Sequence, residues 1–279
     1  MHTMIFKKKA AEEGNLKKGE KLPRISTGVN DLDKLLFGGI PEGASVLLSG
    51  EPGTMKTTLA FHALFYNAKQ GKKCVMVTLE ERSKNILRQM LSMGYDLESI
   101  KIQIIPDLGD SPVRSRQNAD LTIIDIGHFR DYIDTKKKKT KKKDAPEEQD
   151  WIGLMKTVME DIKKEFDFDV FALDSLSALY SLSDIQNLRR DLFHMFGYFE
   201  NLNMTSFFVS EIAPTGGQYS EFGIEEYMAD GIISLRKEER ELKVLGKLNV
   251  VKMRGTQINS DIFIYEYEKN NFKLYQKLD

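Results

Sequence analysis

The strongest constraint on the fold of this chain is a ten-residue segment, 49–58, which reads Ser-Gly-Glu-Pro-Gly-Thr-Met-Lys-Thr-Thr. An apolar run, 44–48, precedes this segment, and leucine and alanine recur at helical spacing after it. Strand, loop and helix therefore follow one another in the order that a phosphate-binding loop requires. Backbone N–H groups at such a helix start lack carbonyl partners and carry partial positive charge, so they suit a polyphosphate.

This loop matches the pattern G-x-x-x-x-G-K-[ST] at every fixed position except one. Lys56 is expected to contact the terminal phosphates, and Thr57 is expected to offer its hydroxyl to Mg²⁺. A simple Gly/Pro turn between a strand and a helix would not need Lys-Thr-Thr at the helix start. The residues expected to bind ATP are Gly50, Glu51, Pro52, Gly53, Thr54, Met55, Lys56, Thr57 and Thr58.

Met55 is the exception, because the pattern has its second glycine there. Glycine tolerates a positive φ and lets the backbone approach phosphate closely, so a methionine at this position must turn its side chain outward. Nucleotide binding is compatible with that change, whereas fast hydrolysis is not assured by the sequence.

Length and composition indicate one α/β domain with extensions rather than two separate domains. The chain has 279 residues, of which 41% are hydrophobic and 30% are charged, so it can bury a large core. These fractions do not indicate disorder throughout, and no apolar stretch reaches the length of a membrane span. The net charge of −1 gives no general attraction to nucleic acid, so any such binding would need a local patch.

Cys74 is the single cysteine of the chain and lies in a strand-like run, so it cannot form an internal disulfide. Its simplest role is that of a small core residue in a reducing compartment. The start of the chain, 1–21, is charged and lacks the apolar core of a signal peptide, so export is not expected. Both features indicate a cytoplasmic protein.

Two charged segments are expected to be mobile. Residues 1–24 form a lysine-containing lead-in to a domain that spans 25–279. Within this domain, 136–143 contains seven lysines in eight positions, which repel one another, so 134–150 is expected to be an exposed insertion loop. The insertion is either a solvated loop without a partner or a contact with nucleic acid or another acidic surface.

A further apolar run, 170–174, ends in Asp174. This position is the carboxyl end of a predicted strand, where ligands gather in open α/β sheets. Taken in isolation, Asp174 and Ser175 could equally begin a helix as its cap. With the phosphate-binding loop upstream, we favour Asp174 as a ligand of Mg²⁺ or of its water.

Glu80 and Glu81 follow another apolar run, 72–79, which we expect to be the strand next to the loop strand. One of the two carboxylates would polarise the attacking water during ATP hydrolysis. Two adjacent acids are also compatible with solvated residues before a helix that Ser83 caps.

The segment 27–43 reads T-G-V-x-x-L-D-x-L-L-x-G-G-I-P-x-G and leads directly into the loop. With its motifs in this order, the chain resembles the KaiC-type ATPases of the RecA superfamily. The resemblance runs from residue 25 to about residue 275 and is interrupted at 107–150. It implies a RecA-like P-loop NTPase fold, an α/β architecture with a twisted, mostly parallel sheet flanked by helices and with C-terminal antiparallel strands.

The resemblance also assigns roles to three acids. Glu80 and Glu81 match the paired glutamates of KaiC-like active sites, and Glu81 is slightly favoured as the base. Glu211 follows a strand-like run, 205–210, at the place where RecA-like folds carry a polar sensor of the nucleotide. A strand-terminal acid in solvent is an equally good interpretation of Glu211.

A basic segment, 252–256, reads Lys-Met-Arg-Gly-Thr and resembles the segment that reaches the neighbouring subunit's nucleotide in KaiC-like hexamers. Strand alternation places Lys252 and Arg254 on one face. In a ring-shaped homo-oligomer they would stabilise the charge that develops on the transferred phosphoryl group. Edge-strand cations that discourage aggregation would explain the charges but not Gly255 directly after them.

The segment 223–236 also resembles KaiC-type domains. Glu226 and Tyr227 stand where clock-type kinase domains carry an adjacent Ser-Thr pair, so self-phosphorylation of that kind is not expected.

Three functions fit these patterns. The first is a ring-forming, Mg²⁺-dependent ATPase that couples hydrolysis to a conformational change. The second is a regulatory or scaffold protein that binds ATP, scarcely cleaves it, and acts on a protein partner. The third is a RecA-like DNA motor, for which the sequence offers one lysine-rich loop.

Overall fold

The computed structural model describes residues 23–105, 118–125, 163, 168–182, 188–202, 204–212, 217–240 and 243–276. Two predictions therefore lie outside the described residues. They are the insertion loop at 134–150 and the lead-in before residue 23.

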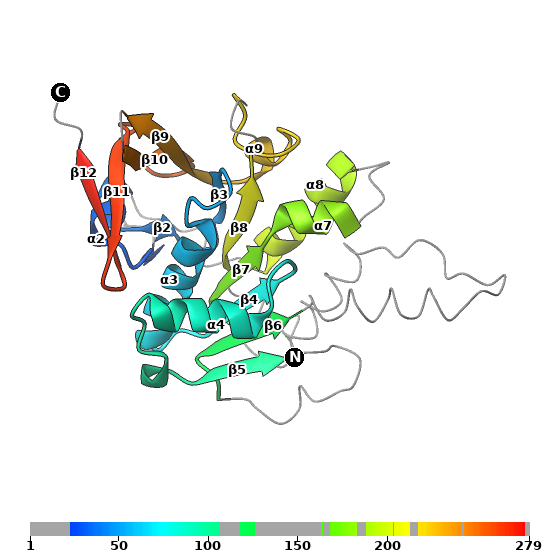
Figure 1. The fold of residues 1–279 in the computed structure, drawn as a ribbon. Coiled ribbons are helices and arrows are strands. Elements are labelled where there is room, and N and C mark those ends of the chain that lie inside the picture. Colours follow the sequence, from blue (N-terminus) through cyan, green and yellow to red (C-terminus); the bar gives the residue numbers. More distant parts are fainter. Residues whose placement is uncertain are drawn as a thin grey trace, which may run out of the picture.

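The framework is a ten-stranded sheet with the strand order β12-β11-β10-β9-β3-β8-β7-β4-β6-β5 (Figure 1). Neighbouring strands from β9 to β5 pair in parallel, and β9 to β12 pair antiparallel. The predicted RecA-like fold with C-terminal antiparallel strands is therefore confirmed. The strands are β3 (Ser45–Gly50), β4 (Cys74–Thr78), β5 (Ile102–Ile105), β6 (Leu121–Asp125), β7 (Val170–Asp174), β8 (Thr205–Glu211), β9 (Gly231–Arg240), β10 (Lys243–Met253), β11 (Phe263–Glu268) and β12 (Asn271–Gln276).

Helices cover both faces of this sheet, and each face has its own apolar core (Figure 1). Along β3, Val46 and Leu48 face one core whereas Leu47 faces the other, as the alternation of a strand requires. The first core is covered by α2 (Asn30–Leu35), α3 (Lys56–Lys69) and α4 (Ser83–Ser92), and the second by α7 (Leu176–Leu182) and α8 (Leu188–Asn201). The central strands are apolar runs because water reaches neither of their faces.

One expectation about strand order is wrong. The strand that ends before Glu80 was expected beside the loop strand β3, but β8 and β7 lie between β3 and β4. Strands that follow each other in sequence often pair, yet β7 and β8 are buried along almost their whole length, so they need a hydrogen-bonded neighbour on each edge as well as cover on each face. The consequence is that Asp174, at the end of β7, lies between the loop and the two glutamates.

A short two-stranded sheet joins the start of the domain to its later segments. It pairs β1 (Arg24–Ile25) with β2 (Ile40–Pro41). The Arg24 guanidinium, which the sequence assigns to the lead-in, donates to the carbonyl oxygens of Leu36 and Gly39 and to the Thr256 hydroxyl. Helix α9 (Glu225–Met228) and a 3₁₀ turn (Leu97–Ser99) complete the described elements. Among the described residues, no helix combines the length and the apolar character needed to cross a membrane.

A buried histidine in α3 makes stability depend on pH. His62 Nδ1 lies 2.9 Å from the Tyr95 hydroxyl, and Nε2 lies 3.1 Å from the Gly28 carbonyl oxygen. Burial lowers the pKa of His62 below its ordinary value of 6.5. The unfolded chain therefore takes up a proton near pH 6.5 that the folded protein takes up only at lower pH.

We accordingly expect the free energy of unfolding to fall as the pH drops through this range, and to fall less in a His62→Gln variant. Urea unfolding at about pH 7.5 and about pH 5 measures the difference. His194→Gln, at an exposed position of α8, is the matched control and should behave as the wild type does. An equal loss of stability in wild type and His62→Gln would contradict the assignment.

Candidate phosphate-binding site

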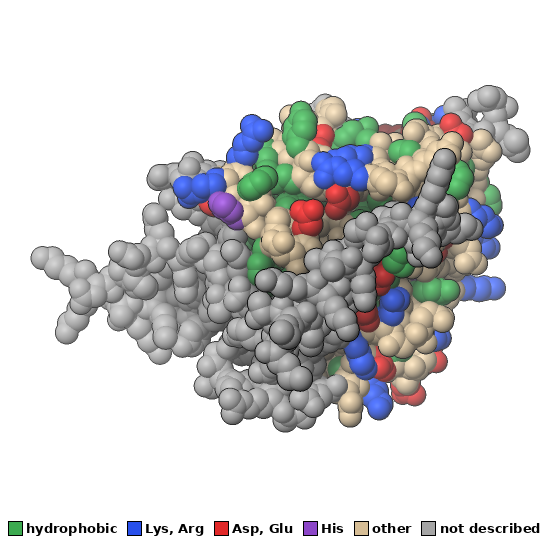
Figure 2. All heavy atoms as spheres, turned by 180° about the vertical axis from the view of Figure 1, so that it is seen from behind, with side chains coloured by type: hydrophobic (Ala, Val, Ile, Leu, Met, Phe, Trp, Pro, Cys, Tyr) green, Lys and Arg blue, Asp and Glu red, His purple; other side chains and the backbone are tan. Residues whose placement is uncertain are grey.

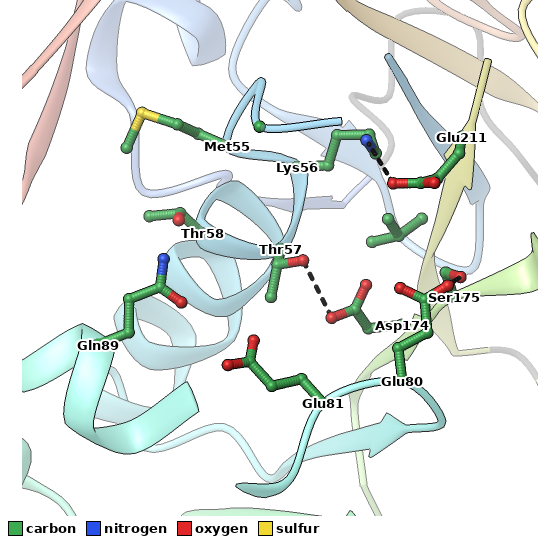
Figure 3. Close-up of a pocket in the computed structure, with 12 residues that line it drawn as sticks. Met55, Lys56, Thr57, Thr58, Glu80, Glu81, Gln89, Asp174, Ser175 and Glu211 are labelled. Carbon is green, nitrogen blue, oxygen red and sulfur yellow. Dashed lines mark hydrogen bonds and ion pairs between the residues drawn. The ribbon is translucent and has the colours of Figure 1, made fainter. Parts of the chain in front are cut away.

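The loop between β3 and α3 adopts the backbone that its sequence predicts. Gly53 has φ +74° and Met55 has φ +66°, so both occupy the left-handed region. The Met55 side chain points away from Lys56 and the acidic residues and packs against the core on the α3 side (Figure 3). The position of the second glycine thus keeps the backbone that glycine would adopt, although a methionine occupies it.

Gly50 is required by a close approach of β9. A Cβ atom at this position would lie 2.3 Å from the Leu235 carbonyl oxygen and 2.6 Å from the Thr54 hydroxyl.

No side chain in the described part of the chain caps α3 at Met55. The first-turn N–H groups of a fourteen-residue helix are thereby available to an anion at its positive end.

Lys56 is buried at the start of α3. Its ammonium group donates to the Glu51 carbonyl oxygen at 2.9 Å and lies 3.6 Å from a carboxylate oxygen of Glu211 (Figure 3). Burial lowers the pKa of Lys56, and the Glu211 carboxylate opposes this effect. Glu211 therefore faces the lysine of the loop across the pocket, at the carboxyl end of β8, the strand beside β3.

Thr57 and Asp174 form a direct pair between α3 and β7. The Thr57 hydroxyl donates to a carboxylate oxygen of Asp174 at 3.0 Å (Figure 3). Asp174 is only 4% exposed. Burial raises the pKa of Asp174 to about 7, the Thr57 hydrogen bond opposes this shift, and the charges of Glu80 and Glu81 add to it. Asp174 does not cap α7, because the Ser175 hydroxyl accepts the N–H of Ala178 there.

These residues enclose one pocket of about 230 Å³. Its charges are unbalanced, because four acids face a single lysine. They are Glu80, Glu81, Asp174 and Glu211, against Lys56. An oxygen-rich, acidic site suits a hard divalent cation.

The oxygen atoms of the pocket suit a Mg²⁺ ion that also binds substrate phosphates, rather than a cation bound by protein side chains alone. Among the described residues, no group of three His, Cys, Asp or Glu side chains could hold a metal ion by itself. Mg²⁺ is commonly bound by one or two protein oxygens together with substrate phosphates. Thr57 and Asp174 would supply those oxygens beside the loop.

The two adjacent glutamates have different partners. A carboxylate oxygen of Glu80 accepts the Ser175 hydroxyl at 2.6 Å. The Glu81 side chain points toward Thr57 (Figure 3), with no partner for its carboxylate among the described residues. Ser83 does not cap the following helix, because its N–H and hydroxyl both donate to Asp125 at 2.8 Å. Both glutamates line the pocket, and Glu81 is the one whose carboxylate is not engaged.

Lys252 and Arg254 do not reach this pocket within their own subunit. Lys252 donates to the carbonyl oxygens of Glu226 and Ala229 at 3.1 and 2.6 Å. The Arg254 guanidinium donates to Asp230 at 3.0 Å and to the Tyr227 carbonyl oxygen at 2.9 Å. The two cations hold the same segment around α9, and the Arg254 side chain is 55% exposed.

Sequence reasoning missed two polar residues of the pocket, Ser175 and Gln89. The position after Asp174 offered a signal for Ser175, because a serine there can cap a helix and also reach a neighbouring strand end. Gln89 lies in the middle of α4, and nothing in its sequence context distinguishes it from a surface residue.

In this chain a phosphate-binding loop follows a buried parallel strand, and an acid stands at the end of a nearby strand. Together with the strand order, these features place the chain in the RecA-like class of P-loop proteins. The family model described as "ATPase: KaiC" matches residues 25–279, and the chain belongs to this family. The resemblance seen in the sequence is confirmed.

Individual relatives agree with this assignment. The chain is 29% identical to the "UPF0273 protein" of Aeropyrum pernix over 84% of its own length and 86% of that protein. It is 26% identical to "Circadian clock protein KaiC3" of Synechocystis over 84% of its own length but only 42% of that protein. A crystal structure of a KaiC-like protein from Pyrococcus horikoshii has a TM-score of 0.70, with 24% identity, and covers 91% of this chain and 100% of that one.

The left-handed backbone at Met55 predicts a graded response to substitution. Met55→Gly should change the free energy of unfolding by less than about 1 kcal/mol, because relief of backbone strain offsets lost packing. Met55→Val should destabilise by about 1–2 kcal/mol, because a β-branched residue tolerates a positive φ poorly. Chemical denaturation measures both, and equal stability of the two variants would exclude this backbone.

Proposed function

We propose that this protein binds ATP with Mg²⁺ in the pocket between the loop and Asp174, and that it hydrolyses the terminal phosphate bond. The observation that carries the proposal is the pairing of Thr57 with Asp174 beside an uncapped helix start and a buried lysine. Lys56 and the loop amides would hold the phosphates, and Thr57 and Asp174 would hold the cation. Bound Mg²⁺ would neutralise charge on the phosphate oxygens.

Glu81 would act as the base that orients the attacking water. Its carboxylate lies in the pocket and has no partner within the described part of the chain, whereas Glu80 is held by Ser175. A carboxylate in this place needs only to accept a proton from water as the phosphoryl group is transferred. Glu80 would position Ser175 and the end of β7.

The site would be completed by a neighbouring subunit in a ring, which we expect to be a hexamer. Lys252 and Arg254 are absent from the described lining of their own pocket, yet the Arg254 side chain is more than half exposed. A cation delivered from the next subunit would stabilise charge on the transferred group. This assembly would couple hydrolysis to changes between subunits.

A nucleotide-gated switch with little turnover is the second candidate. Lys56 is already engaged by the Glu51 carbonyl and by Glu211. Phosphate would compete with Glu211 for the lysine, so binding alone would release Glu211 at the end of β8. A DNA motor gains less support, because acidic and basic side chains are interspersed over the described part of the face in Figure 2.

Turnover separates the two candidates. We expect Mg²⁺-dependent ATP hydrolysis by the wild type, a loss of ATP binding in Lys56→Ala, and retained binding with a kcat about 10²–10⁴ lower in Glu81→Gln. Glu98→Gln, at an exposed position outside the pocket, is the control. Thermal stabilisation by ATP reports binding independently of turnover. Binding without hydrolysis in the wild type would favour the switch.

Mixing two inactive variants tests the contribution from the neighbour. Arg254→Ala keeps its pocket, and Lys56→Ala keeps its cations. In a random equal mixture about a quarter of the interfaces would join an intact pocket to an intact Arg254, so hydrolysis should return to about a quarter of the wild-type rate. A mixture that stays inactive, with assembly verified by mass measurement, would contradict supply in trans.

A further inference from the structure

Residues of the C-terminal antiparallel strands contact the backbone of the phosphate-binding loop. The Tyr265 hydroxyl, on β11, donates to the Thr54 carbonyl oxygen at 2.8 Å. The Lys237 ammonium, on β9, donates to the Pro52 carbonyl oxygen at 3.2 Å. Two carbonyl groups of the loop thus accept hydrogen bonds from residues that lie 185 and 211 positions later in the chain.

Because a peptide unit is planar, these contacts also fix the direction of two N–H groups of the loop. In a trans peptide unit the C=O and N–H bonds point in opposite directions. The Thr54 carbonyl shares its peptide unit with the Met55 N–H, and the Pro52 carbonyl shares its unit with the Gly53 N–H. A hydrogen bond that fixes each carbonyl therefore also fixes the opposite direction of the N–H group in the same unit, and both Gly53 and Met55 line the pocket.

Tyr265 is fixed in the place that this contact requires. Its side chain is 7% exposed, and burial raises its pKa to about 12, so the hydroxyl stays protonated and able to donate. Gly246 lies opposite in the β10–β11 register. A Cβ atom at Gly246 would come within 2.6 Å of the Tyr265 ring, so a glycine leaves the space that the ring fills.

We infer that Tyr265 is a positioning residue for nucleotide binding, which orients the Met55 N–H toward the phosphates through the Thr54 carbonyl. This inference rests on the proposed function and adds a residue to it that the phosphate-loop pattern does not contain. It also explains how a methionine keeps the left-handed backbone at this position, because the peptide unit before it is fixed by a hydrogen bond.

Tyr265→Phe tests the inference, because it removes the hydroxyl and keeps the ring. Tyr267→Phe is the matched control, since that hydroxyl also donates to a backbone carbonyl, that of Met93 at 3.3 Å, but does so away from the loop. In nucleotide-free protein, the Thr54 carbonyl ¹³C and Met55 amide ¹⁵N resonances should shift in Tyr265→Phe, because the hydrogen bond to their shared peptide unit is lost, and should stay in place in Tyr267→Phe.

The affinity for ATP with Mg²⁺, measured by calorimetry, should fall by a factor of about three to ten in Tyr265→Phe, the scale of one neutral hydrogen bond, and remain unchanged in Tyr267→Phe. When the rate of hydrolysis is measured over a range of ATP concentrations, KM should rise more than kcat falls, because the loop is distorted and the base is untouched. Unchanged Thr54 and Met55 resonances in Tyr265→Phe, or an equal loss of ATP affinity in the control, would overturn the inference. If the wild type fails to bind ATP, the proposed function is wrong, and the Thr54 and Met55 resonances alone then decide whether Tyr265 fixes the peptide unit between them.

Discussion

The register of β3 with its two neighbours is the constraint on which the rest of the site depends. Gly50 pairs with Glu211 of β8 on one side and with Leu235 of β9 on the other. Because both ladders are parallel, the loop that follows Gly50 emerges at the edge of the sheet where β7 and β8 also end. A slip of one residue on either side would exchange the side chains that face the two cores and would remove Glu211 from Lys56.

Burial gives this edge its chemistry. Lys56 and Asp174 are both withdrawn from water, and burial shifts the pKa of each toward its neutral form. The hydrogen bond from Thr57 and the charge of Glu211 counteract those shifts without cancelling them. In the proposed function, a polyphosphate with a divalent cation would bring an additional opposite charge to each of these two groups.

Local sequence patterns predicted most of the fold and most of the residues that one subunit contributes to the pocket. The loop, Thr57 and Asp174 could be located because the loop and Thr57 match a motif between a strand and a helix, and Asp174 ends an apolar run that is typical of a buried strand. The position of β4 could not be predicted, since a strand order depends on which apolar runs need cover on both sides. The contact of Tyr265 with Thr54 was equally hidden, because it joins residues 211 positions apart and involves a backbone carbonyl. The roles of Lys252 and Arg254 depend on a second copy of the chain and remain a proposal.

The Arg24 guanidinium joins the first described strand of the domain to two segments that lie later in the chain. It bridges Leu36, Gly39 and Thr256, and the last of these is 232 positions away in sequence. A recombinant fragment that begins at Ile25, where the family match begins, would leave two carbonyl groups and a hydroxyl without their shared donor. A fragment that retains these three hydrogen bonds must therefore start at Arg24 or before it.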